Sequence, residues 1–179
     1  MYACLDASYR EGRAAAACVL FRDWRDERSA GDVAARVGMA RPYIPGRFFL
    51  RELPALLAVL EKVTESLDIL VIDGYVWLDA CHSPGLGAHL YESRGRGTPV
   101  IGVAKSRYRG APALELIRGK GRRPLYISAA GMEVEEAAER IQVMHGPYRI
   151  PALLRRADEL SRRMQDPGGR LDIPSAAVL

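Results

Sequence analysis

Residues 67–74 read LDILVIDG, and this short segment decides the fold class. Its aliphatic and β-branched run over residues 69–72 is typical of a strand that is buried on both faces in a parallel sheet. The run stops at Asp73-Gly74, a pair that favours a turn. The segment therefore predicts an α/β protein whose central strand ends on an acidic side chain.

The segments after and before this strand favour helices and further strands. Leucines and a valine recur at helical spacing over residues 49–64, which predicts an amphipathic helix there. Residues 99–104 form a second apolar strand. The remaining predicted elements are a helix over 84–93, a hairpin of 114–118 with 124–128, and helices over 133–144 and 152–164.

The opening segment is expected to form an antiparallel meander. Residues 2–5, 13–21 and 31–37 are apolar and compatible with strands, and polar turn residues separate them. The alanine content leaves a helix as an alternative for 14–17, and Asp6 is expected to close the first strand. The whole order predicts a mixed sheet, an antiparallel meander joined to parallel strands, with helices on both faces.

The chain has 179 residues, which corresponds to about one domain. We expect a single domain over 1–165 and a loose tail over 166–179. The 49% hydrophobic and 27% charged residues exclude a disordered or fibrous chain. No run approaches the roughly 18–20 apolar residues that cross a bilayer. The absence of a signal peptide and an odd count of three cysteines favour a cytoplasmic protein without a disulfide framework.

The net charge of +4 permits a nucleic-acid partner without demonstrating one. The basic residues are concentrated between Arg94 and Arg123, a stretch that contains few acids. On charge alone, a solvated basic face is the favoured interpretation of this stretch.

Three acids stand where predicted elements begin or end, namely Asp6, Glu52 and Asp73. The carboxyl ends of strands border the binding crevice of an open α/β sheet, so these side chains could converge there. A buried Asp73 needs a metal, a basic group or solvent, because an unpaired charge is costly to bury. Turn chemistry explains Asp73-Gly74 equally well, and the helix dipole explains an acid at Glu52.

Several short motifs together resemble those of the endonuclease V family. They are Tyr43-Ile44-Pro45-Gly46, Arg51-Glu52, Asp73-Gly74, Gly85 to Leu90 and Gly102 to Ser106, in this order. The spacing between Tyr43 and Glu52 also matches the family pattern. Each motif alone is poor evidence, but their order and spacing are fairly specific, and the resemblance extends from Asp6 to about Arg109.

The resemblance implies a ribonuclease H-like fold and a Mg²⁺-dependent endonuclease that cuts DNA or RNA near a deaminated base such as inosine, with Mn²⁺ as a substitute ion. It implies that Asp6, Glu52 and Asp73 bind the metal and that Lys105 lies at the scissile phosphate. Hard oxygen ligands of this kind suit Mg²⁺. Asp158 falls where the family often has a further acid or a histidine near the metals, although a surface acid on a helix is an equally good interpretation.

The resemblance also implies a nucleic-acid interface. Tyr43, on a loop braced by Pro45 and Gly46, would prop the strand open while the altered base is flipped aside. Gly74 would belong to the same interface.

The chain departs from the family pattern after Gly74. Asp79 stands where the family usually has a histidine, and His82 is a candidate replacement, so both are counted as nucleic-acid-binding candidates. Residues 75–78, which read YVWL, replace a small glycine-containing step, and they are expected to reshape the base pocket.

Two other functions stay open on the sequence. A non-cleaving nucleic-acid-binding homologue with a rebuilt base pocket would show salt-dependent binding and no cleavage. A hydrolase of a small phosphorylated molecule would use the same three acids without an extended basic groove. We favour the endonuclease, as a monomer without a membrane partner.

Overall fold

The computed structural model describes residues 1–39 and 49–165, so the predicted tail over 166–179 lies outside the described residues. One mixed sheet forms its centre, with the strand order β3-β2-β1-β4-β5-β7-β6. Its strands are β1 (Tyr2–Arg10), β2 (Arg13–Phe21), β3 (Gly31–Met39), β4 (Ile69–Asp73), β5 (Val100–Ala104), β6 (Leu114–Leu116) and β7 (Leu125–Ala130). β4 lies between β1 and β5 and runs parallel to both, whereas the outer neighbours pair antiparallel. The predicted sheet is thereby confirmed.

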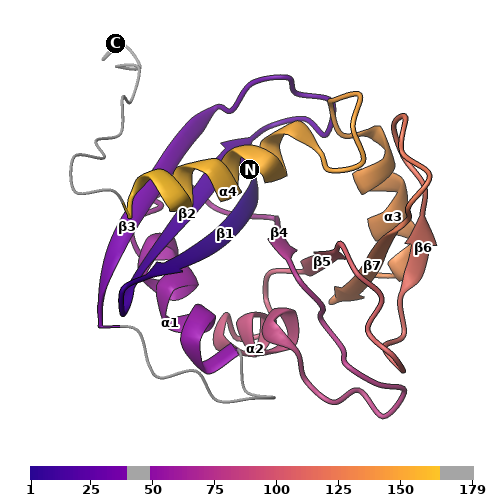
Figure 1. Ribbon diagram of the computed structural model, residues 1–179, viewed down its shortest axis with the longest axis horizontal. Coiled ribbons are helices and arrows are strands. Elements are labelled where there is room, and N and C mark those ends of the chain that lie inside the picture. Colours follow the sequence, from indigo (N-terminus) through magenta and orange to yellow (C-terminus); the bar gives the residue numbers. More distant parts are fainter. Residues whose placement is uncertain (40–48, 166–179) are drawn as a thin grey trace.

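The described helices cover both faces of the sheet. They are α1 (Phe49–Leu60), α2 (Leu86–Ser93), α3 (Val134–Val143) and α4 (Ala152–Arg163). α1 and α2 pack on one hydrophobic cluster, and α3 and α4 pack on another. Figure 1 shows α4 lying across β1 and β2, with α1 and α2 at the other side of the sheet. No helix in the described part of the chain is both long enough and apolar enough to cross a membrane.

The central strand is buried on both faces, as its sequence predicts. Leu70 and Ile72 belong to the cluster under α1 and α2, whereas Ile69 and Val71 belong to the cluster under α3 and α4. Successive side chains of a strand point to opposite faces, so a strand between two helical layers needs apolar residues throughout.

β1 is longer than predicted. The prediction that Asp6 closes the first strand is wrong, because β1 stays paired with β2 as far as Arg10. The two turn residues, Glu11 and Gly12, have positive φ angles of 51° and 77°, the backbone that a tight two-residue hairpin requires. The parallel pairing of β1 with β4, by contrast, ends at Leu5. Asp6 is therefore the first residue of β1 beyond the parallel ladder.

Other boundaries also differ from the predictions. The helix considered for residues 14–17 is wrong, because these residues lie in β2. α1 ends at Leu60 instead of residue 64. The N–H groups of Lys62 and Val63 each donate to the carbonyl three residues earlier, and these bonds turn the chain toward β4. α2 begins two residues later than predicted, because Pro84 forms a β-bridge with Trp77.

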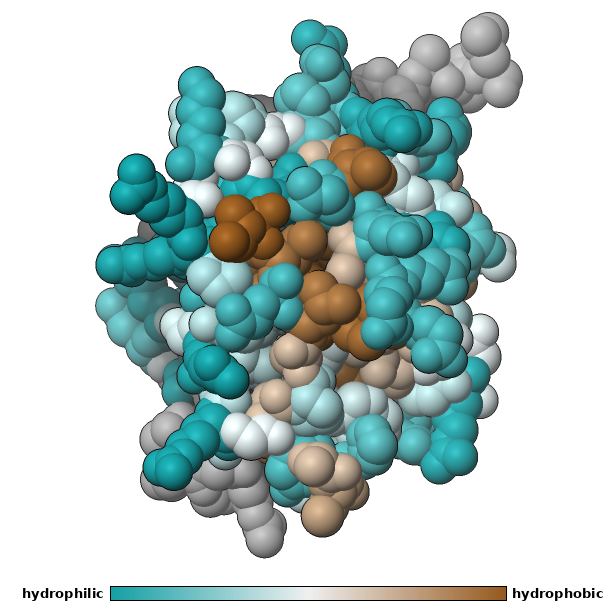
Figure 2. All heavy atoms as spheres, turned by 90° about the vertical axis from the view of Figure 1, so that its right-hand side faces the viewer, coloured by the Kyte–Doolittle hydropathy of each residue, from teal (hydrophilic) through white to brown (hydrophobic). Residues whose placement is uncertain are grey.

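The β6 edge of the sheet carries exposed hydrophobic side chains. Ile117 is 61% exposed and Val143 is 41% exposed. Figure 2 views the molecule from this side and shows hydrophobic side chains gathered among hydrophilic ones. β6 itself has only three residues, and so short an edge strand offers few free backbone groups to another chain.

The tightest contact in the sheet predicts a stability effect. A Cβ atom at Gly102 would lie 2.6 Å from the carbonyl oxygen of Gly74 and 2.7 Å from Oγ of Ser128. We expect Gly102→Ala to lower the free energy of unfolding by about 1–3 kcal/mol in urea denaturation, because both distances are too short for a Cβ atom and the nearer neighbour is a backbone atom. Gly38→Ala is the matched control, since a Cβ there would meet nothing within 4 Å. Equal stability of the two variants would contradict this account of the contact.

Candidate metal centre and nucleic-acid interface

Asp6 and Asp73 lie side by side at the carboxyl end of the parallel strands. The ladder between β1 and β4 ends with Leu5 opposite Ile72, so the aspartates are the next residue on each strand. Leu5 and Ile72 face α1, and the alternation of side chains therefore directs both aspartates to the α4 face. This edge of the sheet presents two adjacent carboxylates.

Glu52 approaches the same edge from the α1 layer. It lies in the first turn of α1, as predicted. Tyr9 of β1 fixes this turn, because its hydroxyl donates to the carbonyl of Arg51 at 2.6 Å and its ring lies 4.3 Å from the guanidinium carbon of Arg51. The residue before Glu52 is thus held directly against β1.

The carboxyl groups sense one another through their charges. Burial, reinforced by the charges of Asp6 and Asp73, raises the pKa of Glu52 to about 8. Burial also raises the pKa of Asp6 to about 6, an effect that the Ser161 hydrogen bond opposes and the charges of Asp73 and Asp158 increase. Each of these groups therefore resists ionisation, because its charge would be poorly solvated and close to like charges.

Lys105 brings a positive charge to this edge. It follows the last residue of β5, and its ammonium group forms an ion pair with Oδ2 of Asp73. The side chains of Lys105 and Asp73 remain 38% and 25% exposed. The pair can therefore be reached from solvent by a ligand.

Asp158 lies on α4, close enough for its charge to act on Asp6. Its own carboxylate pairs with Arg162, one turn along the helix, at 2.8 Å. The fully buried Ser161 on the same helix donates its hydroxyl to Oδ2 of Asp6 at 2.7 Å. Ser161 thus anchors a candidate metal ligand, and it was missed because a serine within a helix carries no motif of its own.

The donor set fits a hard divalent cation in its chemistry, since carboxylate oxygens are the protein ligands that Mg²⁺ prefers. Within residues 1–39 and 49–165, however, no three His, Cys, Asp or Glu side chains lie close enough together to hold an ion. Asp73 is instead paired with the ammonium group of Lys105. A shared cation therefore requires the side chains of Asp6, Glu52 and Asp73 to turn toward one another.

A pocket of about 380 Å³ opens beside Glu52 and Asp73. Aromatic rings contribute to its walls, and Gly74 lines it as well. The hydroxyl of Tyr75 donates to the carbonyl of Ser106 at 2.8 Å and accepts the backbone N–H of Tyr108 at 3.0 Å, which fixes the ring of Tyr75. A mostly apolar pocket with a few polar groups at one side is suited to a flat heterocyclic ligand.

Two of the predicted nucleic-acid-binding residues build the turn beside this pocket. Oδ1 of Asp79 accepts the N–H groups of Cys81 and Ser83 at 2.9 and 3.0 Å. The exposed ring of His82 packs edge-on against Trp77, with 5.0 Å between ring centroids. The other predicted interface residues, Tyr43, Pro45 and Gly46, lie outside the described residues.

Comparisons with known proteins agree on one family. A family model described as Endonuclease V matches residues 1–119. The endonuclease V of Rhodospirillum centenum is 35% identical over 170 residues, which cover 83% of this chain and 69% of that protein. The crystal structure of endonuclease V from Streptomyces avermitilis is 26% identical with a TM-score of 0.72, over 91% of this chain and 80% of that chain.

A further structural neighbour was solved with nucleic acid. Endonuclease V from Ciona intestinalis, in complex with a 24mer DNA containing an inosine followed by a ribo-adenosine, gives a TM-score of 0.75 at 20% identity. The likeness covers 91% of this chain and 84% of that chain, and it shows that the two proteins share a fold.

The raised pKa of Glu52 makes the stability of the metal-free protein depend on pH. Its pKa in the folded protein, about 8, lies above the ordinary 4.5, so the folded state holds this proton more tightly than the unfolded chain does. We expect the free energy of unfolding, measured in urea with a chelator present, to fall as the pH rises from about 4.5 to about 8. Glu52→Gln should remove this part of the fall, whereas the exposed control Glu61→Gln should keep it. An identical pH dependence in both variants would refute the assignment.

Proposed function

The chain belongs to the endonuclease V family, and we propose that it is a metal-dependent endonuclease that hydrolyses a phosphodiester bond of DNA or RNA near a deaminated base such as inosine. The observation that carries the proposal is the gathering of Asp6, Glu52 and Asp73 at one sheet edge, with Lys105 paired to the last of them. The DNA complex of the Ciona intestinalis relative supports a nucleic-acid substrate.

Asp6, Glu52 and Asp73 would hold a Mg²⁺ ion, or Mn²⁺ in its place, with Asp158 as a further acid nearby. When bound, the cation supplies the positive charge that stabilises a phosphodiester under attack by water. The chain itself gathers the ligands on three elements and anchors two of them, Asp6 through Ser161 and Glu52 through the contact of Tyr9 with Arg51. Glu52 has to give up its proton to become a ligand, since its pKa is raised to about 8.

Lys105 is proposed to contact the scissile phosphate. Its ammonium group already lies among the carboxylates, and its side chain is partly exposed. A phosphate oxygen that approached Asp73 would meet this ammonium group. There Lys105 would stabilise the negative charge that develops during cleavage, the role of a fixed positive group in a phosphoryl-transfer site.

The pocket beside Glu52 and Asp73 is the proposed site of the altered base. A base that leaves its stack needs an apolar slot with polar groups at its edge. The rings of Tyr75 and Tyr108 and the backbone at Gly74 offer such a slot. Tyr43, with Pro45 and Gly46, is proposed to take the place that the base leaves in the strand.

The hairpin over residues 77–84 is proposed to contact the nucleic acid at the rim of the base pocket. Two of its residues, Leu78 and Pro84, line the pocket. Asp79 and His82 lie between them, where they are exposed enough to meet a bound strand.

One observation favours a second candidate, the non-cleaving nucleic-acid-binding homologue. The ion pair of Lys105 with Asp73 occupies an oxygen that a metal would use. If this pair persists in the presence of divalent cations, the protein would bind a strand and leave it intact. Cleavage assays separate the two candidates.

We expect nicking of an inosine-containing oligonucleotide in Mg²⁺ or Mn²⁺ and none with a chelator. Asp73→Asn should abolish nicking, because it removes a ligand charge at the centre of the site. Lys105→Gln should slow it by about 10²–10³-fold, the usual cost of losing one stabilising group in the transition state. Both variants should keep the wild-type unfolding midpoint to within a few degrees.

Glu61→Gln, an exposed acid just beyond α1, is the control and should nick at the wild-type rate. An unchanged rate for Asp73→Asn would overturn the proposed metal centre. Salt-dependent binding by the wild type, with no nicking in either ion, would establish the non-cleaving candidate.

A further inference from the structure

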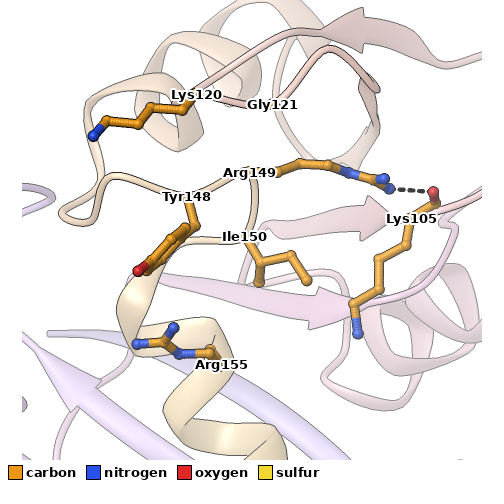
Figure 3. Close-up of a pocket in the computed structure, with 7 residues that line it drawn as sticks. All are labelled: Lys105, Lys120, Gly121, Tyr148, Arg149, Ile150 and Arg155. Atoms are coloured by element: carbon orange, nitrogen blue, oxygen red, sulfur yellow. Dashed lines mark hydrogen bonds between the residues drawn. The ribbon is translucent and has the colours of Figure 1, made fainter.

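A second pocket, of about 470 Å³, adjoins Lys105 and has no part in the reaction proposed above (Figure 3). It lies between the turn after β6 and the segment that leads into α4. Its walls include the side chains of Lys105, Lys120, Tyr148, Arg149, Ile150 and Arg155. Lys105 lines this pocket, and its ammonium group forms the ion pair with Asp73, which lines the pocket proposed for the altered base.

The pocket is strongly basic. Four cationic side chains line it, and no acidic side chain is among the lining residues. Arg155 has a carboxylate neighbour, Glu159, at 3.6 Å, whereas Lys120 has no acidic partner among the described residues. Nε of Arg149 is buried without a hydrogen-bond partner in the described structure. Two of the four cations, Lys120 and Arg149, thus have no acidic partner among the described residues, and such positive charge attracts a polyanion.

Buried Arg118 gives this pocket a fixed shape. Its guanidinium donates to the carbonyls of Tyr148 and Arg149 at 2.7 and 3.2 Å, and to those of Met144 and Gly146. The loop that carries Tyr148 and Arg149 is thus tied to the turn that carries Lys120. Arg149 in turn donates to the carbonyl of Lys105 (Figure 3), which connects the pocket to the proposed catalytic edge.

Tyr148 offers a surface for stacking. Its side chain is 59% exposed, and the guanidinium carbon of Arg155 lies 5.5 Å from its ring centroid. Figure 3 shows the two side chains facing one another beside Ile150. Exposed aromatic rings next to cationic groups are the usual platforms on which proteins bind the bases and phosphates of a single strand.

We propose that this basic pocket is a second subsite for the substrate strand, binding a backbone phosphate through Lys120 and stacking a nearby base on Tyr148. The proposal rests on the proposed function, because it places one strand across Lys105, with the altered base on one side and this subsite on the other. Lys105 connects the two pockets, which favours a nucleic-acid strand over a free anion as the ligand. A free anion would make no stacking contact with the ring of Tyr148.

The test is binding to labelled single-stranded inosine oligonucleotides, measured by fluorescence anisotropy with EDTA so that no cleavage occurs. Three probes are compared: a long strand, the same strand trimmed on the 3′ side of the inosine, and the same strand trimmed on the 5′ side. For the wild type, we expect trimming on one side to weaken binding by about 5- to 100-fold, as the loss of one stacked base does.

Tyr148→Ala should bind the long strand as weakly as the wild type binds the strand trimmed on that side. For Tyr148→Ala, trimming the strand on the same side should then lower the affinity only a little further. Lys120→Gln should reduce the slope of log affinity against log salt concentration by about 0.7, one phosphate contact of a single strand. Lys62→Gln, an exposed lysine before the amino end of β4 and so at the opposite edge of the sheet, should match the wild type.

Variants of Tyr148 and Lys120 that behave like Lys62→Gln would overturn the subsite, even if the wild type nicks inosine strands. The subsite would also be overturned if Lys62→Gln, but neither Tyr148→Ala nor Lys120→Gln, changed the binding of the long strand. Failure of the wild type to nick any strand in Mg²⁺ or Mn²⁺ would count against the proposed function. The binding assay contains EDTA, so its result tests the subsite independently of nicking.

Discussion

Three carboxyl groups lie near the end of the parallel pairing of β1 and β4, and the cost of ionising them together governs this edge of the protein. Lys105 neutralises Asp73, but burial and like charge leave Glu52 with a pKa of about 8 and Asp6 with a pKa of about 6. Acids in such surroundings cost stability when they ionise, unless a cation joins them. Ionising these acids together is therefore costly at this edge, and the proposed cation would offset that cost.

The fold imposes this crowding through a few fixed contacts. Leu5 and Ile72 set the register that brings Asp6 beside Asp73. Tyr9 of β1 holds the first turn of α1, and Ser161 of α4 holds Asp6, so the sheet and the α4 layer contribute one anchor each. Lys105 then joins two pockets, an apolar one beside Glu52 and a basic one beside Tyr148. A strand that crosses Lys105 would meet both.

The sequence predicts the architecture well because hydrophobic pattern and turn chemistry are local. LDILVIDG identifies the doubly buried strand, and the order of the motifs identifies the family. The extent of β1 was missed because its pairing with β2 beyond Asp6 depends on a partner strand. Tyr9, Ser161 and Arg118 were missed for a related reason, since each acts on a segment far away in the chain. Long-range contacts of this kind leave no periodic signal near the residue itself.

Diffraction from crystals soaked in MnCl₂, recorded at the manganese absorption edge, tests most directly whether these acids form one cation site. We expect an anomalous peak bonded to oxygens of Asp6, Glu52 and Asp73, with the Lys105 ammonium group displaced from Asp73. A crystal that takes up manganese elsewhere, or none at all, while Lys105 stays on Asp73, would contradict it.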